Sequence, residues 1–221
     1  MKPVPKYLKD SYSLDIHSYK DVPGWINDAE YIYEHAVNKG SDGQIFVEIG
    51  TLLGQSTLRM ATLIDESNKK IKFDAIDIFY SIPNVVKHSH PVEFTQYLQL
   101  FDDFNLDILG IIKHPLRQLN VEDLVNLIVC DEKYAFKLYD DESISFLWID
   151  GEHTYDVVYS HLVNFWSKIK PGGILAGDDI HYEEVYEAVM DFEKEYKIRG
   201  KNSKQPDYLS NCYNSFYFEK S

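Results

Sequence analysis

The sequence predicts an α/β protein built on a doubly wound, mostly parallel sheet of about seven strands with helices on both faces. Three observations support this class. Short apolar runs typical of buried strands alternate with segments of helical spacing. The chain has 221 residues, 44% of them apolar, which suits one large domain. Each clearly predicted strand is followed at once by a carboxylate.

The first part of the chain predicts two strand–helix steps. Residues 1–22 are polar and carry prolines, so we expect irregular structure there. Gly40 and the Ser-Asp-Gly run after it mark the end of a first helix. The expected elements are a helix over 28–39, a strand over 45–47 that stops at 48–50, a helix over 55–64 and a strand over 72–77.

The region 80–125 is interrupted by Pro83, Pro91 and Pro115, and one amphipathic helix is predicted in it, from Pro91 to about Phe104. Beyond this region the alternation resumes. The expected strands are 126–130, 144–149, 174–177 and 215–218, and the expected helices are 134–139, 157–169 and 183–196. The run Lys170-Pro171-Gly172-Gly173 is expected to end the second of these helices.

Composition excludes several classes of protein. The formal net charge of −14, with no block of Lys or Arg, argues against a nucleic-acid partner. No stretch is apolar enough for a signal peptide or a membrane span, so we expect neither a leader nor a membrane partner. Cys130 and Cys212 form no CxxC pair and suit a reducing compartment. A cytoplasmic protein is therefore expected.

A glycine turn follows the first strand, in the run Val47-Glu48-Ile49-Gly50-Thr51-Leu52-Leu53-Gly54-Gln55-Ser56. Glycines at a strand-to-helix turn allow a ligand close to the backbone, although a simple tight turn explains two glycines equally well. The spacing is G-x-x-x-G and differs from the G-x-G-x-x-G of nicotinamide enzymes. The preceding Glu48 would repel a pyrophosphate but could bind an ammonium group. A nucleoside that carries an amino acid fits better than a dinucleotide.

Asp77 ends the second predicted strand. A carboxylate at this place can accept both hydroxyls of a ribose, as in other nucleotide-binding α/β folds, although Asp also caps loops. Because it follows the glycine turn, Asp77 supports the nucleoside interpretation.

Two later motifs complete a resemblance to a known family. They are Phe146-Leu147-Trp148-Ile149-Asp150-Gly151-Glu152-His153-Thr154-Tyr155 and Lys170-Pro171-Gly172-Gly173-Ile174-Leu175-Ala176-Gly177-Asp178-Asp179. With the glycine turn, the chain from about 44 to 182 resembles class I S-adenosylmethionine (SAM)-dependent methyltransferases, which have a Rossmann-like fold. It is most similar to a small bacterial group with an Ile-Asp-Gly-(Asp/Glu)-His turn, which includes metal-dependent sugar O-methyltransferases. The resemblance implies a methyltransferase domain over 41–221 with a substrate-side insertion around 80–125, after an N-terminal irregular segment and helix over 1–40.

The resemblance also implies a set of cofactor contacts. The methionine part of SAM would lie at the glycine turn, the ribose at the end of the second strand and the adenine after the third. The residues implied are Glu48, Gly50, Thr51, Gly54 and Ser56 for the methionine part, Asp77 for the ribose, Asp131 and Glu132 beside the adenine, and Asp150.

The acids Asp150, Asp178 and Asp179 would repel one another unless they are protonated, hydrogen-bonded or share a cation. Oxygen ligands suit Mg²⁺, and less specifically Ca²⁺ or Mn²⁺. In the sugar O-methyltransferases an equivalent trio binds such a metal, which would align two hydroxyls of the acceptor. Glu152 or His153 would then be the general base. Two alternatives stay open, namely that Asp178 only caps a helix and that His153 only positions other groups.

The sequence thus predicts a SAM-dependent methyltransferase that acts on oxygen of a small-molecule acceptor rich in hydroxyls, such as a sugar. One alternative is a methyltransferase that acts on nitrogen without a metal. Another is a non-catalytic nucleoside-binding protein of the same fold. A homo-oligomer is compatible with the aromatic content, and periodicity alone does not decide it.

Overall fold

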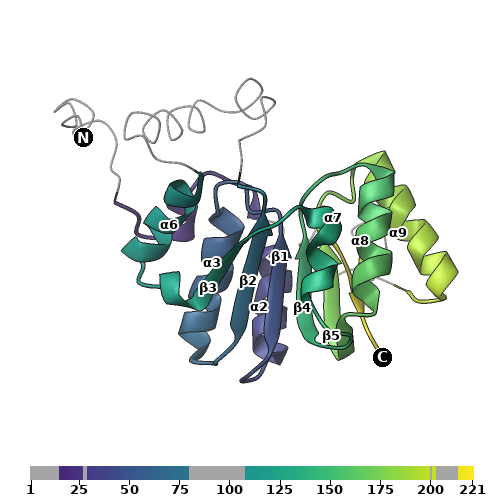
Figure 1. Ribbon diagram of the computed structural model, residues 1–221, viewed down its shortest axis with the longest axis horizontal. Helices are drawn as coiled ribbons and strands as arrows, with labels where there is room; N and C mark the ends of the chain where they lie inside the picture. Colours follow the sequence, from purple (N-terminus) through teal and green to yellow (C-terminus); the bar gives the residue numbers. More distant parts are fainter. Residues whose placement is uncertain (1–14, 27–28, 80–107, 200, 203–213) are drawn as a thin grey trace.

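A computed structural model describes residues 15–26, 29–79, 108–199, 201–202 and 214–221. They form one seven-stranded sheet with the order β3-β2-β1-β4-β5-β7-β6, which confirms the predicted α/β class and strand number (Figure 1). The first five strands are parallel, and β7 runs antiparallel to β5 and β6. The strands are β1 (Ile45–Ile49), β2 (Lys72–Asp77), β3 (Val125–Val129), β4 (Ile144–Ile149), β5 (Ile169–Gly177), β6 (Lys201–Asn202) and β7 (Phe216–Glu219).

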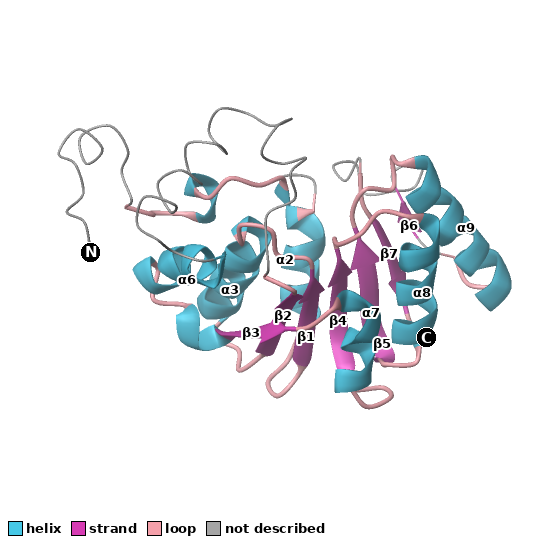
Figure 2. Ribbon diagram, turned by 45° about the horizontal axis from the view of Figure 1, so that its top comes forward, coloured by secondary structure: helices cyan, strands magenta, loops and turns pink. Residues whose placement is uncertain are grey.

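Helices cover both faces of the sheet (Figure 2). Successive strand residues point to opposite faces, so Phe46 packs with one group of helices and Val47 with the other. One core includes α2, α3 and α6, and the second includes α7, α8 and α9. The helical elements are η1 (Tyr19–Asp21), α2 (Glu30–Lys39), α3 (Gln55–Ser67), α6 (Ile108–Gln118), η3 (Glu122–Leu124), α7 (Glu132–Ala135), η4 (Phe136–Leu138), α8 (Tyr155–Trp166) and α9 (Glu183–Tyr196). Among the described residues no helix has both the length and the apolar character to cross a membrane.

Helix α6 differs from the expectation that Pro115 interrupts the chain. Pro115 lies inside the helix, three residues before its last residue. Its ring removes one backbone donor, which normally disfavours a helix interior. The buried side chains of Ile111, Ile112 and Leu116 lie on the core side of this helix and offset that cost. The predicted helix over 91–104 lies outside the described residues.

Strand β5 begins at Ile169, earlier than predicted, because the Lys-Pro-Gly-Gly run is a bulge within the strand. The register with β4 moves from Ile169 opposite Ile144 to Ile174 opposite Phe146. Gly172 (φ +75°) forms the turn of this bulge, and its N–H donates to the carbonyl of Lys220 over 2.7 Å. The helix before it, α8, ends at Trp166 and not at 169 as predicted.

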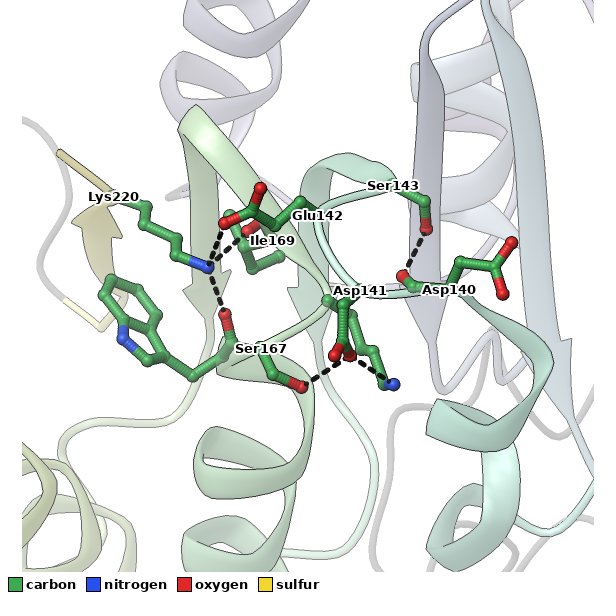
Figure 3. Close-up of polar contacts among 9 residues, drawn as sticks. Asp140, Asp141, Glu142, Ser143, Ser167, Ile169 and Lys220 are labelled. Atoms are coloured by element: carbon green, nitrogen blue, oxygen red, sulfur yellow. Dashed lines mark hydrogen bonds and ion pairs between the residues drawn. The ribbon is translucent and has the colours of Figure 1, made fainter.

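The acidic run Asp140-Asp141-Glu142 before β4 is a surface turn, and ion pairs stabilise it (Figure 3). Asp141 accepts from Lys168 over 2.7 Å and from the hydroxyl of Ser167 over 3.1 Å. The ammonium of Lys220 lies 3.9 Å from Glu142 and donates to the carbonyl of Ile169 over 2.7 Å. These contacts lie at the edge of the sheet where β4 and β5 begin. They therefore stabilise the sheet at the edge opposite the carboxyl ends of these strands.

Candidate functional site

The carboxyl ends of the parallel strands meet at one edge of the sheet, as the fold class requires. Backbone bonds join the residues directly after these strands. The N–H of Gly50 donates to Ile76 over 3.0 Å, that of Asp150 to Ile49 over 2.8 Å and that of Asp178 to Ile149 over 3.1 Å. The side chains after the strands are therefore placed by the sheet itself.

At Gly50 the turn after β1 lies close against the backbone that follows β4. The φ of Gly50 is +84°, and a Cβ on it would lie 1.9 Å from the carbonyl oxygen of Asp150. A side chain is excluded here by both backbone conformation and space. Gly54 also has a positive φ, +85°, and directly precedes α3, whose first N–H groups lack partners within the helix. The turn thus leaves open backbone donors at the edge of the sheet.

Glu48 is buried, with 1% of its surface exposed, and its carboxylate accepts three hydroxyl groups. Thr57 donates over 2.6 Å, Tyr33 over 3.2 Å, and Ser56 also donates. Burial raises the pKa of Glu48 to about 7. The carboxylate of Glu48 therefore holds the first turn of α3, including Ser56, against the end of β1.

Asp77 organises the same loop. One carboxylate oxygen accepts from the N–H of Thr51 over 3.0 Å and from its hydroxyl over 3.3 Å, and the other accepts from the N–H of Phe79 over 3.0 Å. A carboxylate has about four acceptor positions, so a ligand hydroxyl can still bind. Ile78, the next residue, is 53% exposed and offers an apolar surface beside this acid.

The predicted adenine-side acids have separate local roles. Asp131 is exposed and caps α7 by accepting from the N–H of Lys133 over 3.0 Å. Glu132 extends to the turn after β4, where it accepts from the N–H of Glu152 over 3.4 Å. A Cβ on Gly151 would lie 1.9 Å from Glu132 Oε2, so only glycine permits this contact. Burial raises the pKa of Glu132.

Three side chains converge at the ends of β4 and β5. Asp150, His153 and Asp179 each offer a ligand atom, and these atoms lie within 4.8 Å of one another. His153 Nε2 is 2.7 Å from Asp179 Oδ2. Asp179 has φ +62°, a left-handed conformation that Asp tolerates better than most residues. The structure thus brings together two members of the predicted acidic trio and adds a histidine.

The remaining predicted residues lie around this group. Asp178 is not part of it, and one of its carboxylate oxygens accepts from the buried hydroxyl of Ser215 over 3.1 Å. Glu152 is exposed and also lies outside the group. His181 Nδ1 is 3.7 Å from the second oxygen of Asp179. Asp179 therefore lies between two histidines.

The charges of this group need compensation. Burial and the neighbouring Asp178 and Asp179 raise the pKa of Asp150 well above its ordinary value. The hydrogen bond to Asp179 raises the pKa of His153. Both directions mean that the site favours bound positive charge, either a proton or a cation. Two carboxylates and one imidazole are also a common donor set for a divalent metal.

Comparison with known proteins identifies the family. Residues 47–180 match the family described as a methyltransferase domain, and this range contains the glycine turn and the Asp150–His153–Asp179 group. The chain belongs to this methyltransferase family. No curated protein matches the chain by sequence.

Solved structures support the fold of this methyltransferase. The O-methyltransferase NovP has a TM-score of 0.62 at 13% identity, covering 88% of this chain and 80% of that one. A protein from Streptococcus mutans, assigned as a methyltransferase and solved with S-adenosylhomocysteine (SAH), has a TM-score of 0.59 at 15% identity, covering 88% and 98%. A Staphylococcus aureus protein assigned as a caffeoyl-CoA O-methyltransferase has a TM-score of 0.56 at 16% identity, covering 98% of both chains.

Several residues of the site were not predicted from the sequence. Tyr33 is a buried core residue of α2, and its hydroxyl donates to Glu48. Ser215, directly before β7, contacts Asp178 from 37 positions later in the chain, which no local pattern indicates. Ile78 had a usable signal, because it is an apolar residue placed directly after the end of a strand.

Proposed function

We propose that this methyltransferase transfers the methyl group of SAM to an oxygen of a small, hydroxyl-bearing acceptor such as a sugar. The observation that carries the proposal is the Asp150–His153–Asp179 group directly beside the glycine turn. Methyl transfer is an in-line displacement at a sulfonium carbon, so aligning donor and acceptor supplies much of the rate. A poorly acidic hydroxyl also needs help to lose its proton, and this group offers that help.

The methyl donor is assigned from the glycine turn and its neighbours. The open donors after Gly54, at the start of α3, suit the amino-acid part of SAM, and Asp77 suits the ribose hydroxyls. The exposed face of Ile78 suits a purine ring, and Glu132 can accept from an exocyclic amine. The SAH bound to the Streptococcus mutans protein of the same fold supports this assignment.

A divalent cation fits the donor set of Asp150 and Asp179. When bound, such an ion lowers the pKa of an acceptor hydroxyl. Mg²⁺ was expected from the acids alone. With His153 as a third ligand in place of its role as a base, the same 4.8 Å group would suit Mn²⁺ or another transition ion better than three carboxylates do, so both ions belong in the test. Asp150 and Asp179 would hold the ion, and Asp178 would add negative charge beside it.

His153 is the proposed general base. Its bond to Asp179 orients the ring and favours the protonated form, as a base requires after it has accepted a proton. The imidazole is also stacked on Tyr182, with ring centroids 5.4 Å apart. Glu152, the alternative base, stays a prediction because its exposed carboxylate lies outside the group.

A titration with SAH, with and without Mn²⁺ or Mg²⁺, tests the proposal. Ligand at about 100 times its Kd should stabilise the folded protein by roughly 2.7 kcal/mol. A further rise with Mn²⁺ would support the cation, and methyl transfer to a panel of sugars would then test the acceptor. If SAH does not raise Tm at millimolar concentration, SAM is not the donor.

A His153→Gln variant separates the two roles of the histidine. Retained Mn²⁺ affinity with lost turnover supports the base, and lost Mn²⁺ affinity reassigns His153 as a ligand. The cytoplasmic location, the homo-oligomer and the division at residue 40 stay predictions.

A further inference from the structure

We infer that Gln55 is a positioning residue whose amide holds residues 22–26 against the first turn of α3, so that this segment forms one wall of the cofactor site. The inference rests on the proposed function, because it concerns the same glycine turn. The implied family contacts placed the turn as a whole against the cofactor. The structure gives the side chain of Gln55 a different partner.

Both ends of the Gln55 amide bind one short backbone segment. Its nitrogen donates to the carbonyl of Val22 over 2.5 Å, and its oxygen accepts from the N–H of Ile26 over 3.1 Å. These two bonds satisfy one donor and one acceptor of the segment, as a neighbouring strand would do. The side chain of Gln55 therefore holds the loop Pro23-Gly24-Trp25 at both of its ends. We call this pair of hydrogen bonds the clip.

The packing around the clip is close. Val22 and Ile26 are 1% and 4% exposed and belong to the core beneath α3. Gly24 lies directly over Gln55, and a Cβ on Gly24 would be 2.6 Å from Gln55 Cβ. A second attachment lies one turn further along α3, where the guanidinium of Arg59 is 5.0 Å from the ring of Tyr19. The chain from Tyr19 to Ile26 is thus attached at two points along one helix.

The position of Gln55 in the chain gives the clip its functional meaning. It is the first residue of α3, between Gly54 of the glycine turn and Ser56, which donates to Glu48. The residues at the start of the helix therefore bind Glu48 on one side and the segment on the other. Figure 1 shows the segment, in purple, along the edge where β1 and β2 end. Trp25, within the clipped loop, is 51% exposed.

Removing the two bonds while keeping the shape of the side chain tests the role. Gln55→Met retains the stem and loses both hydrogen bonds, and SAH affinity measured by calorimetry should fall about tenfold, the range expected for one or two such bonds. Gln44→Met, in the loop before β1 at the opposite edge, is the matched control and should bind SAH as the wild type does. Hydrogen exchange should become faster at residues 22–26 in Gln55→Met and stay unchanged in α8.

Trp25 supplies a spectroscopic readout that a general loss of stability would not imitate. SAH should change the tryptophan fluorescence of the wild type, and Trp25→Phe should remove that change. Gly24→Ala disturbs the same contact from the other side and should reproduce the weaker SAH binding if Gln55→Met fails to fold.

The outcomes separate this inference from the proposed function. If the wild type does not bind SAH, the proposed function fails. Independently of this result, unchanged hydrogen exchange at residues 22–26 in Gln55→Met would show that Gln55 does not hold this segment. If the wild type binds SAH and Gln55→Met binds it within twofold as tightly, Gln55 does not position the wall of the site.

Discussion

Replacing Gly50 by alanine tests how the sheet builds the site. The backbone at Gly50 has φ +84°, and its missing Cβ would lie 1.9 Å from the carbonyl oxygen of Asp150. Alanine therefore meets two separate costs. The left-handed conformation costs about 1–2 kcal/mol, and forcing β1 and β4 apart adds about 1–3 kcal/mol, as overpacking does elsewhere.

Gly43 separates these two costs. It has a similar φ of +79°, but a Cβ there would meet nothing within 4 Å. Gly43→Ala should lower the free energy of unfolding by about 1–2 kcal/mol, and Gly50→Ala by about 2–5 kcal/mol. Because Asp150 must move in the second variant only, cation affinity should fall in Gly50→Ala and remain normal in Gly43→Ala.

Urea unfolding measures the free energies of both variants, provided that the slope m stays constant. Calorimetry with Mn²⁺ measures the cation affinity of both variants. Equal destabilisation by the two substitutions would show that the contact with Asp150 relaxes at no cost. The argument that Gly50 sets the distance between the ends of β1 and β4 would then be wrong.

Three further substitutions test individual acids. The pKa of Glu48 rises from 4.5 to about 7 on folding, so the folded state binds the proton more tightly than the unfolded state does. The proton therefore stabilises the folded state by about 3 kcal/mol. This stabilisation is complete below pH 4.5 and is lost as the pH rises through 7. Glu48→Gln should therefore reduce the fall in unfolding free energy between pH 5 and 7. If the unfolding free energies of wild type and variant fall in parallel with pH, the pKa of Glu48 is not raised on folding. Asp179→Asn suits the left-handed backbone and should weaken Mn²⁺ binding at least about tenfold, with SAH affinity nearly unchanged; equal loss of both ligands by calorimetry would indicate a structural role. Asp77→Ala should weaken SAH binding by about 1–3 kcal/mol, and unchanged affinity would remove Asp77 from the cofactor site.

Local sequence patterns predicted most of the strands and helices. The bounds of β2, β4 and α9 match the prediction, because their apolar periodicity and flanking turn residues agree. The carboxylates after the strands could also be placed at one edge, since parallel strands end together. The fold class and the presence of Asp150 and Asp179 in one group followed from this reasoning alone.

Contacts between distant parts of the chain could not be predicted in this way. Pro115 indicated a break, and only the tertiary packing of α6 shows why the helix continues. The bond between Tyr33 and Glu48 depends on how α2 crosses the sheet. Whether Asp178 or His153 joins the other two acids depends on side-chain orientation, which spacing does not encode.

The bond between Ser215 and Asp178 has a consequence for how the protein is made. It joins residues 37 positions apart, and β7 enters the sheet beside β5 only after all five parallel strands have been synthesised. A nascent chain can therefore pair β1 to β5 on the ribosome before the bond from Ser215 to Asp178 can form. The core side chains of β7, Phe216 and Phe218, and the bond to Asp178 are therefore added last. The appearance of activity should accordingly lag behind the pairing of the parallel strands during synthesis.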